Sequence, residues 1–339
     1  MEGPYTIYGA LGSPYSMKMR AVLRYRRLSP IFVTATPGDE PIAHVRPPVI
    51  PVLLFPDGSW HVDSTPMIET LERDLPPMRS LLPDDAALAF LAWLIEDFAD
   101  EWCTKMMFHY RWYREPDQQA FSHWGAFDRL AGHGRGAIER TAAAFAERQI
   151  ARMPLVGCTE GNRPLIEETF RELIGLLDAH VTERHFLFGS RPSVADFGLY
   201  GQLSQLASDP TPAGLMRAET PYAYRWVAHL DDASGIEGEW LGFDTAGSAL
   251  LDGLLALCRE VYLPFLAANA AAVAAGEDEF ELAIRGHAWR QGTFRYQAKC
   301  LARLRERYAA LGDRDRRRVD GLLGESAIDI IAVLAEDAP

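Results

Sequence analysis

Residues 5–25 read YTIYGALGSPYSMKMRAVLRY and pass from a β-prone run, through two glycines, into a helical pattern. The run at the start predicts a short strand, which Gly9 and Gly12 bring to an end. Ser13 suits the N-cap of a helix and Pro14 its first position, because proline lacks a backbone N–H that is unpaired there in any case. The segment therefore predicts a strand followed directly by a helix.

The next fifty residues continue this unit. Residues 31–34 form a second β-prone run. Residues 52–55 and 60–62 flank Pro-Asp-Gly-Ser at 56–59, which predicts a hairpin because Asp-Gly tolerates the backbone angles of a tight turn. A helix is expected from about 65 to 75. A strand, a helix and a strand in this order predict a parallel pair, to which the hairpin adds an antiparallel one.

Beyond residue 84 the strand signals end and helical patterns dominate. Residues 209–212 (DPTP) predict a loop, because two prolines so close together are not expected to continue a helix. The expected helices lie at 86–113, 136–151, 164–182, 194–207 and 221–231, and then near 246–275, 279–311 and 314–335.

The composition limits the classes of function. The chain of 339 residues has 34 basic and 47 acidic residues, and its net charge of −13 argues against a broad surface for nucleic acid or an anionic membrane. Its four cysteines form no CxxC pair and its histidines show no zinc-binding spacing, so neither a disulfide framework nor a metal site is expected. No signal-peptide pattern and no apolar run long enough to span a bilayer occur, so we expect a cytoplasmic protein.

Four segments together resemble the glutathione transferase superfamily. In chain order they are GSPYS at 12–16, VIPVL at 49–53, DS at 63–64 and FGSRPSVADF at 188–197. Their order and spacing carry the resemblance, which covers residues 4 to 231. In the last segment Ser193 and Asp196 fit the N-cap and N3 positions of a helix, which is a structural role.

The resemblance implies a three-part architecture. We expect an α/β thioredoxin-like domain at residues 1–80, an all-α domain at 86–231 and a helical extension at 236–339. The extension is not part of the usual family pattern. It contains enough apolar residues to pack against the two preceding domains. The family is commonly homodimeric, so we expect a homodimer.

Ser13 is the first candidate for a catalytic residue. The thiolate of glutathione is the nucleophile, and lowering the thiol pKa needs a hydrogen-bond donor and positive potential at the sulfur. A hydroxyl at a helix N-cap offers both, and the resemblance implies this role for Ser13, with simple N-capping as the alternative. Tyr8 is the next candidate and Ser16 the third. Since position 13 is not cysteine, thiol–disulfide chemistry is disfavoured.

Pro51 belongs at a strand entrance, because it removes one ladder donor. The residues alone favour a trans bond before it, since most X–Pro bonds are trans. The resemblance implies a cis bond instead, which lets Ile50 present its backbone N–H and C=O to the cysteinyl unit of glutathione.

Ser64 precedes a helix, whose unpaired first-turn N–H groups can bind a carboxylate. The resemblance implies that Ser64 holds the α-carboxylate of the γ-glutamyl group and that Asp63 attracts its ammonium; a plain helix cap is the alternative. The resemblance also gives Arg46, or else His44, the glycyl carboxylate of glutathione. An exposed loop arginine is the competing interpretation of Arg46.

An aromatic and methionine-rich stretch ends the expected helix at 86–113. Such stripes at helical spacing are typical of a core. The resemblance implies that the acceptor substrate packs in this region, and the hydrophobic pocket is predicted from Tyr15, Trp102, Met106 and His109.

The sequence thus predicts a glutathione transferase, with glutathione as co-substrate and a hydrophobic small-molecule electrophile as acceptor. A glutathione-dependent lyase, isomerase or dehalogenase would share these motifs. A non-catalytic module that binds ligands or proteins would share the fold. The electrophile is not identified by the sequence.

Overall fold

The computed structural model describes residues 3–333 and divides into two compact units. The first unit comprises the chain up to Leu81 together with Tyr110–Ile150 and Phe197–Gly238. The second comprises Leu82–His109, Ala151–Asp196 and the chain from Glu239 onward. Because these units are assembled from interleaved segments, the three sequence-derived domains stay a prediction.

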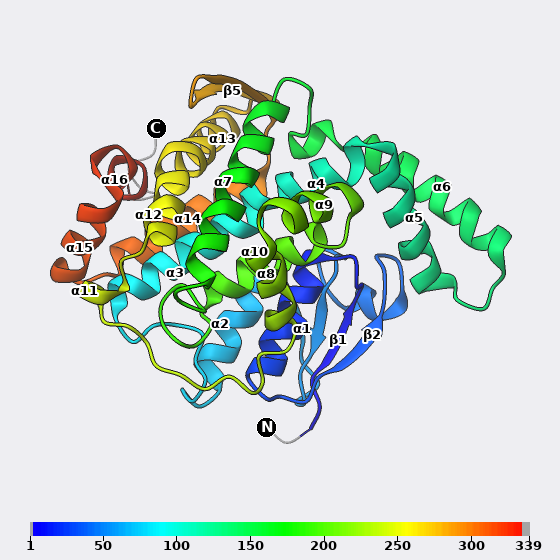
Figure 1. Cartoon of the computed structure of the whole chain (residues 1–339), viewed down its shortest axis with the longest axis horizontal. Helices are drawn as coiled ribbons and strands as arrows, with labels where there is room; N and C mark the ends of the chain where they lie inside the picture. Colours follow the sequence, from blue (N-terminus) through cyan, green and yellow to red (C-terminus); the bar gives the residue numbers. More distant parts are fainter. Residues whose placement is uncertain (1–2, 334–339) are drawn as a thin grey trace. The chain divides into compact units, whose positions relative to one another are not determined.

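The first unit contains a four-stranded mixed sheet (Figure 1). Its strands are β1 (Thr6–Gly9), β2 (Ile31–Thr34), β3 (Val52–Leu54) and β4 (Trp60–Val62), in the spatial order β2-β1-β3-β4. β1 pairs with β2 in parallel and with β3 antiparallel, and β3 pairs antiparallel with β4. The predicted parallel pair and hairpin are confirmed.

Two helices complete the α/β part of this unit. α1 (Pro14–Tyr25) begins directly after Ser13, and α2 (Ser64–Asp74) follows β4, as predicted. A short 3₁₀ helix, η1 (Glu40–His44), lies between β2 and β3. Together with the long helical part of the chain, this mixed sheet confirms the predicted fold class, thioredoxin-like and then all-α.

Six further helices contribute to the first unit. They are the end of α4 (Thr104–Tyr113), α5 (Glu115–Leu130), α6 (Arg135–Ile150), most of α8 (Val194–Leu206), α9 (Pro210–Glu219) and α10 (Pro221–Asp231). The predicted loop at 209–212 is wrong, because α9 begins there with Asp209 as N-cap. Pro210 and Pro212 lie in its first turn, where backbone N–H groups have no partner within the helix. α5 is not among the helices that the sequence pattern predicts.

The second unit is mainly helical. The expected helix at 86–113 is α3 (Ala86–Phe98), a π segment η2 (Ala99–Cys103) and α4 in succession. The other elements are η3 (Pro154–Val156), α7 (Arg163–Val181), α11 (Phe243–Ala246), α12 (Ala249–Leu257), the π segment η4 (Cys258–Tyr262), α13 (Leu263–Ala275), α14 (Arg295–Ala309), α15 (Asp313–Leu323) and α16 (Glu325–Ile331). α14 and α15 contact α3, and α12 contacts α7, so the C-terminal segments pack on the earlier helices of this unit.

The predicted capping pair is present in the second unit. The Ser193 N–H donates to the Asp196 carboxylate at 2.8 Å, and the Asp196 N–H donates to Ser193 Oγ at 3.4 Å. Asp196 also accepts from the Leu187 N–H at 3.0 Å. This confirms the structural interpretation of the 188–197 segment.

The expected helix near 279–311 is wrong in its first half. Residues 279–292 form the antiparallel hairpin of β5 (Glu279–Ile284) and β6 (His287–Gly292). The signal was an alternation of period two, since Phe280 and Ile284 are buried while Glu279 and Glu281 are exposed. The expected helix at 314–335 is α15 and α16, and its last two residues lie outside the described residues.

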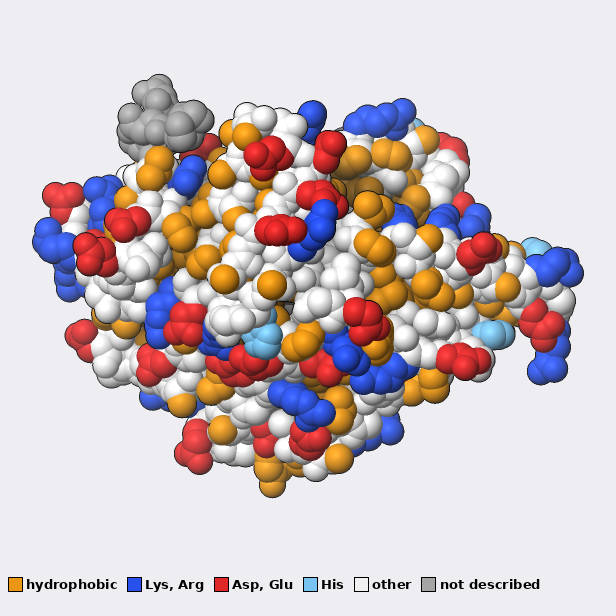
Figure 2. Space-filling view, turned by 90° about the horizontal axis from the view of Figure 1, so that it is seen from above, with side chains coloured by type: hydrophobic (Ala, Val, Ile, Leu, Met, Phe, Trp, Pro, Cys, Tyr) orange, Lys and Arg blue, Asp and Glu red, His pale blue; other side chains and the backbone are white. Residues whose placement is uncertain are grey.

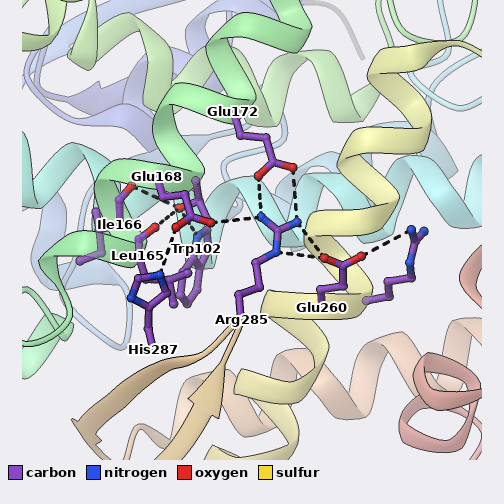
Figure 3. A network of polar contacts seen from close by, with 10 residues as sticks. Trp102, Leu165, Ile166, Glu168, Glu172, Glu260, Arg285 and His287 are labelled. Atoms are coloured by element: carbon purple, nitrogen blue, oxygen red, sulfur yellow. Dashed lines mark hydrogen bonds and ion pairs between the residues drawn. The ribbon is translucent and has the colours of Figure 1, made fainter.

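The tip of this hairpin is anchored by Arg285 (Figure 3). Its guanidinium lies between Glu172 of α7 and Glu260 of η4, with nitrogen–oxygen distances of 2.5 and 2.9 Å. His287 lies 3.0 Å from Glu168 of α7. Side chains far apart in the sequence thus fix the hairpin to the helices.

The surface carries mixed charge on the face shown in Figure 2, where Asp and Glu side chains are interspersed with Lys and Arg. Within residues 3–333, none of the helices combines the length and the apolar character that crossing a membrane requires.

Candidate functional site

Ser13 occupies the N-cap of α1, as predicted. Its backbone is extended, and its Oγ accepts a hydrogen bond from the Ser16 N–H at 3.3 Å. The side chain is half-buried. Because Oγ is the acceptor in this bond, the hydroxyl proton can be donated to a neighbouring anion. The unpaired N–H groups of the first helical turn add positive potential at the same place.

Ser16 has a structural role in the interior of the first unit. It is completely buried, and its Oγ accepts from the Ala10 N–H at 3.2 Å. This bond ties α1 to the loop that follows β1. A Cβ on Gly9 would lie 2.5 Å from the same oxygen, so Ser16 also packs closely on β1.

Tyr8 lies on the other face of the sheet. Alternate residues of a strand face opposite sides, and Gly9 faces α1 through its contact with Ser16. Tyr8 instead stacks on Trp60 with ring centroids 5.6 Å apart, beside a buried cluster that includes Val52. Of the three candidates for the catalytic residue, Ser13 is the one that combines partial exposure with a helix N-terminus.

The bond between Ile50 and Pro51 is cis, as the resemblance implied. It lies directly before β3, whose first residue Val52 pairs with Tyr8 of β1. Pro51 is buried and Ile50 is half-buried against the cluster around Val52. The predicted cis bond is therefore present at the entrance to β3, and the contact of Ile50 with glutathione stays a prediction.

Ser64 is the first residue of α2 and is buried. Its Oγ accepts from the ammonium group of Lys18, a completely buried residue of α1, at 3.4 Å. Asp63 precedes it with a φ of 74°, and its carbonyl oxygen accepts the Met67 N–H at 3.1 Å. The sequence pattern predicts Lys18 on the polar side of α1, and this is wrong, because the side chain is completely buried.

Arg46 is exposed and bonds its own loop. Its Nη1 donates to the carbonyl oxygens of Ala43 and Val45 at 2.9 and 2.8 Å. The alternative residue His44 stacks on Trp60 at 4.3 Å and lies 3.1 Å from Glu40. A role for either residue toward glutathione stays a prediction.

The residues of the expected acceptor pocket belong to different units. Tyr15 lies on α1 of the first unit, half-buried. Trp102 and Met106 are completely buried in the second unit, where Trp102 donates to Thr169 Oγ1 at 3.2 Å. His109 is also buried there, 3.0 Å from Glu167.

In this structure, Trp102 is part of an aromatic core. Its ring packs on Phe265 and Trp289 with centroid distances of 5.6 and 4.9 Å. Trp102 therefore has the core role that is typical of such aromatic stripes. The acceptor pocket stays a prediction.

The cysteines are all free and buried. Burial raises the pKa of the Cys158 thiol to about 12 and raises the pKa of Cys103 well above its ordinary value. Such thiols stay protonated at neutral pH and are poor nucleophiles. Among residues 3–333, His, Cys, Asp and Glu side chains form no group of three or more suited to a metal ion.

Comparison with solved structures finds glutathione S-transferases. One from Methylobacterium radiotolerans, in complex with glutathione sulfonate, is 21% identical, with 71% of this chain and 97% of that chain covered and a TM-score of 0.41. One from Methylobacillus flagellatus with glutathione bound is 21% identical, with 68% and 96% covered and a TM-score of 0.40. The Tau class enzyme from mango, Mangifera indica, is 17% identical, with 68% and 90% covered and a TM-score of 0.41.

Comparison with curated protein sequences finds no match. Two family models match the chain. The glutathione S-transferase N-terminal domain matches residues 7–78, and the glutathione S-transferase C-terminal domain matches residues 112–229. Together they cover more than half of the sequence, and their order agrees with the mixed sheet followed by helices. The chain belongs to the glutathione S-transferase superfamily.

Proposed function

We propose that this protein is a glutathione transferase in which Ser13 stabilises the glutathione thiolate for attack on a hydrophobic electrophile. The observation that carries the proposal is the place of Ser13, half-buried at the N-cap of α1 with its Oγ accepting the Ser16 N–H. The hydroxyl proton is then the donor toward the sulfur. Family membership supports the use of glutathione.

The proposed reaction has two steps, deprotonation of the glutathione thiol and attack by the thiolate. The glutathione thiol loses its proton to solvent, and the thiolate sulfur forms a bond to the electrophilic carbon of the acceptor. The bond broken at that carbon is either the one to a leaving group, which takes the electron pair, or a conjugated π bond, whose electron pair stays on the acceptor and is protonated by solvent. Ser13 donates to the sulfur while it is negative, and the N-terminus of α1 favours the same charge. A single positioned donor of this kind accounts for about 10²- to 10³-fold in rate at other sites that stabilise a developing anion.

Glutathione would lie along the cis peptide before β3 and the N-terminus of α2. Ile50 would offer its backbone to the cysteinyl unit, and Ser64 would bind the α-carboxylate of the γ-glutamyl group, with Asp63 near its ammonium. The buried contact of Ser64 with Lys18 supports this assignment, because it adds a cation next to the proposed carboxylate site. Arg46 would meet the glycyl carboxylate.

The proposal is less specific about the residues that bind the electrophilic acceptor. Tyr15 follows Ser13 by two residues and is half-buried, which supports a place beside the reacting sulfur. Trp102, Met106 and His109 stay predicted pocket residues. The homodimer, which the family resemblance implies, and the cytoplasmic location, which the sequence pattern predicts, likewise remain proposals.

Binding is tested first by thermal unfolding of the full chain with glutathione and with an S-alkyl glutathione. A ligand at about 100 times its Kd adds ~2.7 kcal/mol to the folded state, so the transition should rise by a few degrees. The rise should vanish in Ser64→Ala and persist in Ser59→Ala, a serine in the exposed β3–β4 turn. No rise at millimolar ligand would contradict the proposal.

Turnover is tested with a panel of electrophiles. We expect Ser13→Ala to lower kcat/KM roughly 10- to 1,000-fold, as for loss of one preorganised donor. Unchanged turnover in Ser13→Ala would refute its role. Binding without conjugation of any electrophile would instead favour a non-catalytic module or another glutathione-dependent reaction.

A further inference from the structure

The three residues between β1 and the N-cap Ser13 all have their carbonyl groups engaged in hydrogen bonds. The Ala10 oxygen accepts the Ser13 N–H at 3.0 Å. The Leu11 oxygen accepts from Gln205 Nε2 of α8 at 3.1 Å, and the Gly12 oxygen accepts from Arg111 Nη1 of α4 at 2.8 Å. These contacts lie within the first unit. The loop carbonyls are therefore directed toward the protein's own donors.

Arg111 is held in place on every side. Its Nε donates to Asp209 at 2.8 Å and its Nη2 donates to Gln205 Oε1 at 2.8 Å, while both Arg111 and Asp209 are buried. Its guanidinium lies 3.6 Å from the centroid of the Phe121 ring. Because the planar guanidinium is fixed by two hydrogen-bond partners and by an aromatic ring, its remaining nitrogen, Nη1, can donate to the Gly12 oxygen in only one orientation.

Phe121, a residue of α5, packs against both Arg111 and the backbone of Gly12. A Cβ on Gly12 would lie 2.4 Å from Phe121 Cε2, so the loop backbone sits directly on this ring. Arg111 and Gly12 thus share one aromatic surface, and the ring limits where the Gly12 peptide can go.

We propose that Arg111, supported by Gln205, is a positioning residue that turns the Leu11 and Gly12 carbonyls inward and so keeps both oxygens away from the glutathione sulfur to which Ser13 would donate. The inference rests on the proposed function. A carbonyl oxygen that turned toward the sulfur would repel a thiolate, because both carry negative charge. The buried guanidinium binds the oxygen and prevents that rotation. Arg111 acts through the loop backbone rather than by contact with the substrate.

The test uses the full chain and the double variant Arg111→Met/Asp209→Asn, which removes the buried cation together with its carboxylate partner. The pKa of bound glutathione is measured by pH titration of thiolate ultraviolet absorbance, alongside kcat and the KM for glutathione. We expect the thiol pKa to rise by about one unit and kcat near neutral pH to fall roughly tenfold, less than for a donor that touches the reacting atom. The KM for glutathione should change little.

Two milder variants keep the test informative if the double variant is poorly folded. Arg111→Lys retains a cationic donor and should leave the thiol pKa closer to that of the wild type. Gln205→Leu removes the Leu11 contact and one Arg111 partner, and should raise the thiol pKa.

A matched control is the ion pair of Arg26 and Glu72 in the same unit. Arg26, the C-cap of α1, is buried, and its guanidinium lies 2.7 Å from the half-buried carboxylate of Glu72 in α2. Arg26→Met/Glu72→Gln should lower thermal stability without moving the thiol pKa. An equal shift of thiol pKa in this control would show that Arg111 has only a structural role.

The outcomes separate this inference from the proposed function. Wild-type protein that binds no glutathione would overturn both. Wild-type protein that binds and conjugates glutathione, with Arg111→Met/Asp209→Asn folded and unchanged in thiol pKa and kcat, would overturn the inference alone.

Discussion

The ammonium group of Lys18 donates to the hydroxyl oxygen of Ser64, and both side chains are buried. An ammonium has donors and no acceptor, so Ser64 must accept in this bond. The bond places an ammonium beside the N-terminus of α2, where the first-turn N–H groups also favour an anion.

Replacing Lys18 by methionine, which has similar length, tests this relationship. We expect Lys18→Met to raise the Kd for glutathione roughly tenfold, in line with ~1.5 kcal/mol for a hydrogen bond to a charged group. Calorimetric titration should show the loss with glutathione and not with an analogue that lacks the γ-glutamyl α-carboxylate. Equal losses for the two ligands would disprove a carboxylate-specific role.

Gly12→Ala tests the close approach of the loop to Phe121. Because the new Cβ would lie 2.4 Å from the ring, we expect the loop to shift, with a loss of about 1–3 kcal/mol in the free energy of unfolding, as is typical of overpacking, and lower kcat/KM. Phe121→Leu in the same chain should restore part of both. Gly214→Ala is the control, since a Cβ there would meet no atom within 4 Å. A neutral Gly12→Ala would contradict the packing argument.

Asp97 gives the second unit a pH-dependent stability. Burial raises the pKa of Asp97 to about 7, against a lowering by the Tyr262 hydroxyl, which donates to it at 2.6 Å. Since the pKa in the unfolded chain is about 3.9, the folded state binds the extra proton between these values. The stability contributed by the protonated form is present below about pH 4 and is lost as the pH rises to about 7.

Asp97→Asn removes this titration and keeps an acceptor for Tyr262. Denaturant unfolding at several pH values should show the free energy of unfolding of the wild type falling relative to the variant between about pH 4 and 7. A difference that does not change with pH would contradict the raised pKa.

The β5–β6 hairpin depends on Arg285. Arg285 has a φ of 48°, a conformation that asparagine tolerates, so Arg285→Asn removes the contacts with Glu172 and Glu260 without straining the turn. We expect faster amide hydrogen exchange across residues 279–292 and a loss of about 1–3 kcal/mol in the stability of the hairpin. Arg290→Met is the control, because that side chain is 65% exposed and its pairs with Glu279 and Glu281 contribute little. Similar exchange in the two variants would show that Arg285 is not the anchor.

Sequence alone determined the elements that local interactions specify. Ser13 and Pro14 fix the start of α1, and the Ser193–Asp196 pair caps α8, because each bond joins residues within one helical turn. The Asp-Gly turn similarly fixes the β3–β4 hairpin. The cis bond at Pro51 followed from the family resemblance, since local preference favours trans.

Two predictions from local sequence patterns are wrong, because each pattern is compatible with either of two kinds of secondary structure. Pro210 and Pro212 were predicted to form a loop, yet they begin α9, because a first turn needs no N–H from them. Residues 279–292 are predicted as part of a helix and instead form two strands. Only packing against α13 and the anchor at Arg285 settle that segment as a hairpin.

Only the tertiary structure decided which distant side chains meet. Lys18 and Ser64 are 46 residues apart, and Arg111 and Gly12 are 99 apart. Trp102 is covered by Phe265 and Trp289, which lie far along the chain. Such contacts depend on how whole elements pack, and no periodicity within a single segment encodes them. The sequence by itself therefore points to the residues of the proposed thiolate site, and the fold decided which buried cations contact its neighbours.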